Sequence, residues 1–65
     1  MQVVVNGKET STEAASLSDL VREHVTPGAK VATALNGQFV PAAERAQRQL
    51  KSGDRIEIVS PRQGG

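Results

Sequence analysis

The sequence contains no cysteine, tryptophan or tyrosine, and its only aromatic residue is Phe39. Without cysteine, the chain can form neither a disulfide nor a zinc thiolate site, and it has no cysteine nucleophile. Nucleic-acid binding usually requires a basic stripe, often with aromatic side chains for stacking. The net charge here is only +1 and is spread along the chain without blocks. We therefore do not expect a nucleic-acid partner.

Long apolar runs are missing as well. A membrane-spanning helix needs roughly 18 or more apolar residues in succession, and no run in the chain approaches this length. The opening MQVVVNGKET has no basic segment followed by a long apolar stretch, so it does not resemble a signal peptide. We expect no membrane partner and a cytoplasmic location, which the absence of cysteine also suits.

Groups that could make the chain an enzyme are few. His24 is the only histidine, and near the end of a predicted helix the helix dipole favours a cation, so we expect it to be structural. One histidine with scattered carboxylates does not have the spacing of a metal site. No glycine-rich phosphate loop occurs either. The prediction is a chain with no catalytic residue, no metal and no cofactor of its own.

Two Asn-Gly pairs predict two β-hairpins, because Asn-Gly readily adopts the positive φ angles of a type I′ turn. Asn6-Gly7 lies in the first hairpin, and its return strand is polar, which suits the edge of a sheet. Asn36-Gly37 lies in the second hairpin. The predicted strands are residues 2–5, 8–11, 31–35 and 38–40.

An amphipathic helix is predicted between the two hairpins. Ser16 is a good N-cap, and Asp19 three residues later approximates a capping box. Pro27-Gly28 ends the helix, because proline lacks the backbone amide and restricts the residue before it. Apolar residues follow one helical stripe, formed by Leu17, Leu20, Val21 and Val25.

The rest of the chain predicts a short helix or helical turn within residues 42–50 and a last strand at residues 55–59. The first and last strands would pair in parallel if both lie at the centre of the sheet. The expected fold class is α+β, with a mixed sheet of four to five strands and one main helix across one face. We assign residues 1–61 to this domain and residues 62–65 to a flexible tail. The core would combine the helix stripe with Val3, Val5, Ile56 and Ile58.

The final pair, Gly64-Gly65, adds no side chain to a core. It leaves the carboxylate of Gly65 unhindered, at the end of a segment narrow enough to enter the nucleotide site of an adenylating enzyme. Joining that carboxylate to AMP would turn a poor electrophile into a good one. An unstructured tail without chemistry is the alternative interpretation, since chain termini are commonly disordered.

Four segments of the sequence resemble one family: MQVVVNG, ALNGQFVP, GDRIEIVSP and the terminal QGG. Together they are similar to the sulfur carrier proteins of thiamine biosynthesis (the ThiS family), which are ubiquitin-like proteins of the β-grasp fold. The resemblance covers essentially all 65 residues. It implies the fold that the periodicity also predicts.

The resemblance further implies that the chain is a protein co-substrate and not an enzyme. An E1-like adenylating enzyme, using ATP and magnesium, would activate the Gly65 carboxylate. A sulfur donor system, a cysteine desulfurase or an equivalent, would convert it to a thiocarboxylate. Thiazole synthase would then take the sulfur for the thiazole ring. Gly65 would be the modified residue, and Gly64, Gln63 and Arg62 would thread into the partners.

Three alternatives remain open. The small subunit of molybdopterin synthase and the carriers for cysteine or tRNA thiolation share the fold and the terminal glycines, although VSPRQGG and the short length resemble the thiamine carriers more. A β-grasp interaction module without terminal chemistry is the third. Family members often carry an aromatic residue soon after the V-P motif, where this chain has AAERAQ, so we do not expect a partner contact made by such an aromatic.

On the exposed sheet face, we expect a docking patch formed by Val4, Val40 and Val59.

Overall fold

The computed structural model describes residues 1–60. Its first hairpin pairs β1 (Gln2–Val5) with β2 (Lys8–Ser11) in antiparallel register. The connecting Asn6 and Gly7 have φ angles of 51° and 82°, the left-handed conformation that Asn-Gly adopts at low cost. The predicted hairpin is confirmed.

The main helix, α1 (Leu17–His24), begins where the sequence predicts. The Ser16 hydroxyl accepts a hydrogen bond from the Asp19 amide at 3.2 Å, which satisfies a backbone donor that the first helical turn leaves free. Leu17 and Leu20 are completely buried against the sheet. The helix is therefore held by its cap at one end and by its apolar stripe along its length.

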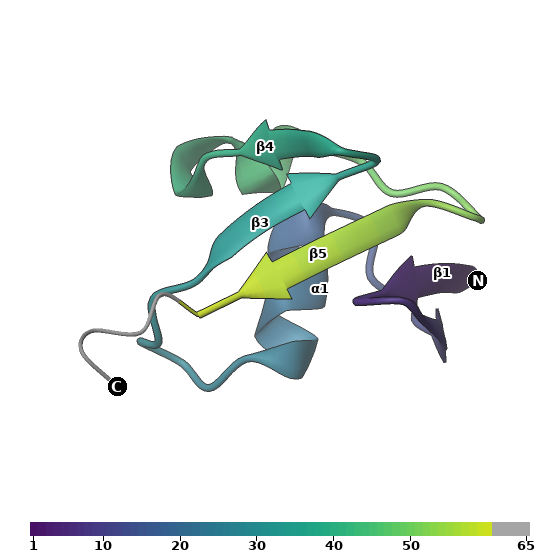
Figure 1. The fold of residues 1–65 in the computed structure, drawn as a ribbon, viewed down its shortest axis with the longest axis horizontal. Coiled ribbons are helices and arrows are strands. Elements are labelled where there is room, and N and C mark those ends of the chain that lie inside the picture. Colours follow the sequence, from purple (N-terminus) through teal and green to yellow (C-terminus); the bar gives the residue numbers. More distant parts are fainter. Residues whose placement is uncertain (61–65) are drawn as a thin grey trace.

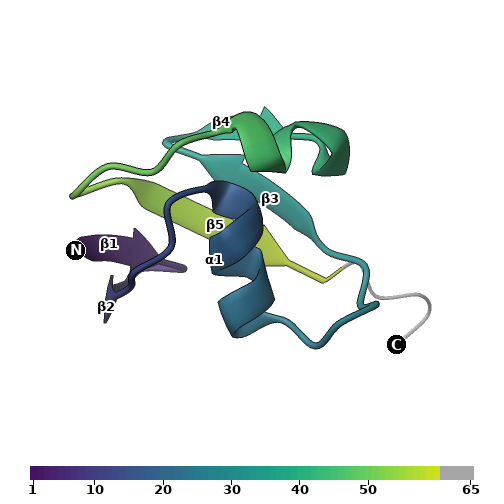
Figure 2. The same ribbon diagram turned by 180° about the vertical axis from the view of Figure 1, so that it is seen from behind.

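The second hairpin joins β3 (Ala32–Leu35) to β4 (Gln38–Val40) through Asn36-Gly37. The segment after it is a 3-10 helix, η1 (Ala42–Gln47), where the sequence predicts a helical turn or short helix. At the end of η1 the Arg48 carbonyl accepts a hydrogen bond of 2.9 Å from the Leu17 amide. This contact joins η1 to the start of α1 (Figure 2).

The last strand, β5 (Arg55–Val59), lies at the centre of the sheet (Figure 1). The strand order is β2-β1-β5-β3-β4. β5 runs parallel to β1 and antiparallel to β3, so the predicted parallel pairing of first and last strands is confirmed. The polar strand β2 is at an edge, also as predicted.

α1 covers one face of the sheet, and the opposite face is open (Figures 1 and 2). Side chains from α1 and from one side of the strands meet in a single core. Val21 and Ile58 are partly buried against this core, while Val25, the last residue of the predicted stripe, lies at the helix C-cap. The buried apolar residues are Val3, Val5, Ala14, Leu17, Leu20, Leu35, Val40, Leu50 and Ile56.

Neither helix within residues 1–60 combines the length and the apolar character that crossing a membrane would demand.

Candidate functional site

The predicted reactive end of the chain follows directly from the central strand. β5 ends at Val59, and Ser60 is the last residue that the structure describes. The predicted modified residue Gly65 lies outside the described residues, and so do Gly64, Gln63 and Arg62. The predicted boundary between domain and tail, after residue 61, lies outside them too. What the structure does describe is the surroundings of the tail's attachment point.

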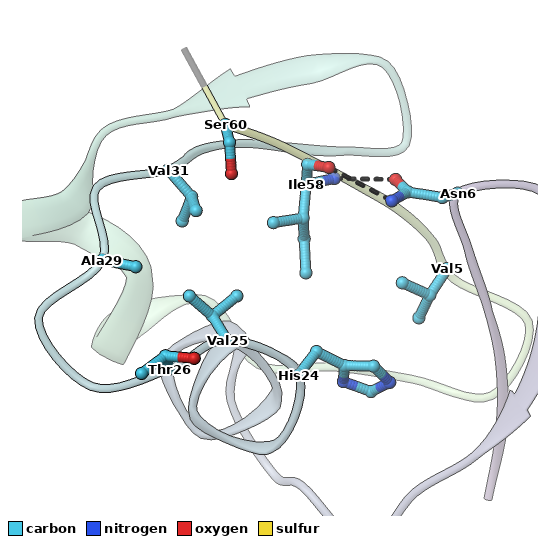
Figure 3. A pocket seen from close by; sticks show the side chains of 9 residues that line it. All are labelled: Val5, Asn6, His24, Val25, Thr26, Ala29, Val31, Ile58 and Ser60. Carbon is cyan, nitrogen blue, oxygen red and sulfur yellow. Dashed lines mark hydrogen bonds between the residues drawn. The ribbon is translucent and has the colours of Figure 1, made fainter. Parts of the chain in front are cut away.

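A groove of about 410 Å³ opens beside this attachment point (Figure 3). The C-terminal end of α1 and the loop after it, as far as Val31, form one wall, and the ends of β1 and β5 form the other. Val5, Val25, Val31 and Ile58 give it an apolar side, and polar residues line the rest of it: Asn6, His24, Thr26 and Ser60. We call it the root groove, because the chain leaves the domain beside it.

His24 lies at the root groove and is exposed. Its Nδ1 is 3.1 Å from the carbonyl oxygen of Leu20, one helical turn earlier, so an Nδ1–H tautomer donates this bond. The imidazole thus adds a side-chain hydrogen bond to a carbonyl of the last helical turns. This contact fits the structural role that the sequence predicts for His24.

The open face of the sheet carries an apolar patch over β3, β4 and the end of β5. Within residues 1–60, Phe39 at 67% and Val59 at 58% are the most exposed large apolar side chains, ahead of Met1 at 44%. Ala32 and Ala34 lie between them and leave a shallow hollow of about 150 Å³. We call these four residues, with Glu57 at the hollow's edge, the open-face patch.

The structure places only two of the three predicted docking residues, Val4 and Val59, on the open face of the sheet. Val40 is completely buried in the core, so it cannot be part of an exposed surface, and this prediction is wrong. Val4 is half-buried and faces the open side, but it pairs with Arg55 at the opposite end of β5 from Val59. Of the three valines, only Val59 lies in the open-face patch.

Phe39 belongs to this surface but is not among the predicted docking residues. Its outward orientation follows from the register of the second hairpin. A two-residue turn at Asn36-Gly37 pairs Leu35 with Gln38, and therefore Ala34 with Phe39 and Thr33 with Val40. Directly paired residues share a face of the sheet. Once Leu35 is assigned to the core, Val40 must face inward and Phe39 outward.

Both Asn-Gly turns also contact β5 through their asparagine side chains. The Asn6 carboxamide accepts a hydrogen bond from the Ile58 amide at 2.8 Å and donates one to the Ile58 carbonyl at 3.1 Å. The Asn36 carboxamide accepts from the Arg55 amide at 2.9 Å and donates to Asp54 at 3.1 Å. The two turns thus hold β5 at its two ends, from opposite sides.

Charged groups form no metal centre in the part of the chain that the structure describes. Within residues 1–60, no three histidine, aspartate or glutamate side chains are close enough to hold an ion. Asp54 is buried, and its carboxylate accepts bonds from the Lys51 amide and from Asn36. These contacts make Asp54 a structural residue of the loop before β5.

The parallel β1–β5 pair within a mixed five-stranded sheet and the one main helix across a face of that sheet define a ubiquitin-like β-grasp protein. Comparison with protein families makes this more specific. The ThiS family matches residues 2–65, and the chain belongs to this family. The resemblance expected from the sequence is confirmed.

Solved structures agree with this assignment. The crystal structure of a thiamine biosynthesis protein (ThiS) from Geobacter metallireducens is 26% identical to the chain, with a TM-score of 0.82, and all of each chain is covered. An NMR solution structure of a thiamine biosynthesis protein from Geobacter metallireducens is 26% identical to the chain, with a TM-score of 0.78. The alignment covers all of this chain and 88% of the Geobacter chain. No curated protein matches the chain significantly.

Proposed function

We propose that the chain is a sulfur carrier that supplies sulfur for thiamine biosynthesis, and that Gly65 is the residue that carries it. The observation behind the proposal is the ThiS family match, which extends through Gly65. The similarity to thiamine biosynthesis proteins of the same fold supports the pathway. The terminal Gly-Gly supports the chemistry, since no side chain hinders the carboxylate.

The chemistry needs partner enzymes. In an E1-like adenylating enzyme, the Gly65 carboxylate would attack the α-phosphorus of ATP with magnesium present, forming an acyl-adenylate and releasing pyrophosphate. A persulfide from a cysteine desulfurase or an equivalent donor would displace AMP and form an acyl disulfide. A thiol would reduce that disulfide and release the thiocarboxylate. Thiazole synthase would then take the sulfur for the thiazole ring.

The domain itself would contribute recognition. The open-face patch combines a protruding aromatic ring with small alanine residues beside it, and Phe39 has the exposure of an anchor residue. Large aromatic side chains that enter a partner's pocket commonly dominate the binding energy of an interface. The patch includes Val59, the last residue of β5, so a partner bound there lies next to the point where the described chain ends.

An adenylation assay tests the proposal. The chain is incubated with the adenylating enzyme of the same organism, ATP and magnesium, and pyrophosphate release is measured. The expected result is release that depends on the chain and disappears when Gly65 is removed. Release that is unchanged by removal of Gly65 would contradict the proposal, and so would the absence of release from the intact chain with an enzyme shown to be active.

A further inference from the structure

We propose that Asn6 positions the root of the tail, because its carboxamide fixes the last part of β5 through two hydrogen bonds to Ile58. The inference rests on the proposed function, in that the tail must deliver Gly65 to an enzyme's active site. It assigns to an exposed turn residue, 52 positions away from Ile58 in the chain, a role in that delivery.

The geometry shows that the Asn6 side chain continues the parallel ladder after β1 has ended. The Val4 amide donates to the Asp54 carbonyl, and the Asn6 amide donates to the Ile56 carbonyl, each at 2.9 Å. In a parallel ladder, the next two bonds would join Ile58 to the carbonyl of residue 6 and to the amide of residue 8. The turn directs the backbone away from β5 at this point, and the side chain supplies both bonds instead.

Ile58 depends on this contact at one edge of β5. The other edge is held by β3, where Thr33 pairs with Ile58 and Ala32 with Val59. At the edge toward β1, the backbone pairing ends at Ile56. The Asn6 carboxamide thus fixes the strand from its second side immediately before Val59 and Ser60, where the chain leaves the domain.

Of asparagine, aspartate and glycine, only asparagine meets both requirements at position 6, the turn conformation and the two hydrogen bonds to Ile58. Aspartate would keep an acceptor for the Ile58 amide, but it would place a second carboxylate oxygen against the Ile58 carbonyl. Glycine would accept the φ angle of 51° and make neither bond. Asparagine adopts the left-handed conformation of the turn and also carries a donor and an acceptor. One residue therefore sets the turn and the end of the strand.

Asn36 provides a matched control. It has the same φ of 51°, precedes a glycine in the same kind of turn, and also makes two side-chain hydrogen bonds at β5. Its contacts are at Arg55 and Asp54, at the end of β5 that is remote from the tail. Asn6→Gly and Asn36→Gly thus remove equivalent interactions from opposite ends of one strand.

The test compares these two variants in two measurements. The first is ¹⁵N relaxation of the free proteins at Val59 and Ser60. The second is steady-state adenylation by the organism's adenylating enzyme with ATP and magnesium. We expect Asn6→Gly to increase motion at both residues and to lower kcat about tenfold, because small misplacements of a reacting group are costly. The KM for the chain should change less than about twofold, since the open-face patch is intact.

Asn36→Gly should leave the motion at Val59 and Ser60 and the kcat as in the wild type. Equal losses in both variants, or an unchanged Asn6→Gly, would overturn the inference, because a general loss of stability would affect both alike. If the intact wild-type chain is not adenylated, the proposed function fails. The relaxation comparison still decides in that case whether Asn6 fixes the end of β5.

Discussion

Phe39 and Val40 are neighbours in the chain and face opposite sides of the sheet. Val40 is completely buried, whereas Phe39 is 67% exposed. Strand geometry requires the alternation, since successive side chains point to opposite faces. Because both residues are apolar, their identity alone does not reveal which one is in the core. Replacing Phe39 by alanine should therefore affect binding, and replacing Val40 by alanine should affect stability.

Phe39→Ala should weaken binding to the adenylating enzyme while leaving the domain folded. Truncating an aromatic anchor costs at least about 1–2 kcal/mol of binding free energy, a factor of roughly 5–30 in affinity. The exposed ring contributes little to the core, so the unfolding free energy should change by no more than about 0.5 kcal/mol. Calorimetric titration and urea unfolding measure the two effects.

Val40→Ala is the matched control for Phe39→Ala. It should lower the unfolding free energy by about 1–3 kcal/mol, because it leaves a cavity in the core. The affinity of the folded protein should stay close to that of the wild type. If Phe39→Ala bound as tightly as the wild type, the open-face patch would not be the docking surface.

The turn before β5 gives a second prediction at residue scale. The buried Asp54 carboxylate accepts hydrogen bonds from the Lys51 amide at 2.8 Å and from Asn36 at 3.1 Å. Asp54→Ala leaves the Lys51 amide without this partner, and should lower the unfolding free energy by about 1–3 kcal/mol. Urea unfolding checks this. A loss no larger than that of an exposed carboxylate, such as Glu13→Ala, would contradict the assigned role.

Some residue-level features can be predicted from the sequence and others cannot. The inward positions Val3, Val5 and Ile56 follow from strand alternation, and the structure confirms them. The predicted exposure of Val40 is wrong, because the register of the two-residue turn pairs Val40 with the buried Thr33. The contact between Asn6 and Ile58 could not be derived, because it joins residues 52 positions apart through side-chain geometry.

At the scale of elements, α1 depends on its N-cap. Ser16→Ala removes the acceptor for the Asp19 amide and should lower the unfolding free energy by about 1 kcal/mol. Ser18, two residues later and inside the helix, is the control. Ser18→Ala should change stability by less than about 0.5 kcal/mol, since alanine is the better helix former. Equal effects of the two changes in thermal or urea unfolding would argue against the cap.

The elements differ in how far sequence pattern determines them. α1 follows from an N-cap, an apolar stripe and Pro27-Gly28, all of which are local signals. η1 has no buried residue, so no apolar period marks its type. The Arg45 guanidinium instead holds it to the sheet, donating to the Thr33 hydroxyl at 2.9 Å and the Val31 carbonyl at 2.6 Å. Such long-range polar contacts leave no periodic signal in the sequence.

At the scale of the whole molecule, fold and proposed chemistry occupy different parts of the chain. In the part of the chain that the structure describes, residues 1–60, every buried core residue lies between Val3 and Ile56. Deleting Gly64-Gly65 should therefore change the unfolding free energy by no more than about 0.5 kcal/mol, while sulfur loading is lost completely. Urea unfolding measures the stability of the deletion variant, and mass spectrometry measures its sulfur loading. Loading that survives the deletion would support an interaction module without terminal chemistry.

The global fold was predictable because few arrangements satisfy its constraints. The polar strand β2 suits only an edge, and the apolar strands β1 and β5 suit the centre, where they pair in parallel. The pathway was not predictable from these physical patterns. A terminal Gly-Gly is compatible with several sulfur carriers, and the ThiS family match is what separates them.

The measurement that tests the central claim most directly uses the absence of cysteine. The protein is purified from cells growing without thiamine, treated with iodoacetamide at neutral pH, and weighed intact by mass spectrometry. A thiocarboxylate at Gly65 would be the only sulfur nucleophile of its kind in the chain, since no cysteine thiol competes. Oxidation of Met1, which raises the mass almost as much as replacing oxygen by sulfur, does not create an alkylation site.

The account predicts a fraction of the protein that carries one alkyl group, located on the C-terminal peptide, and none in a variant that lacks Gly65. A protein that stays unalkylated, even after incubation with its adenylating enzyme, ATP and a persulfide donor, would contradict the claim that Gly65 carries sulfur.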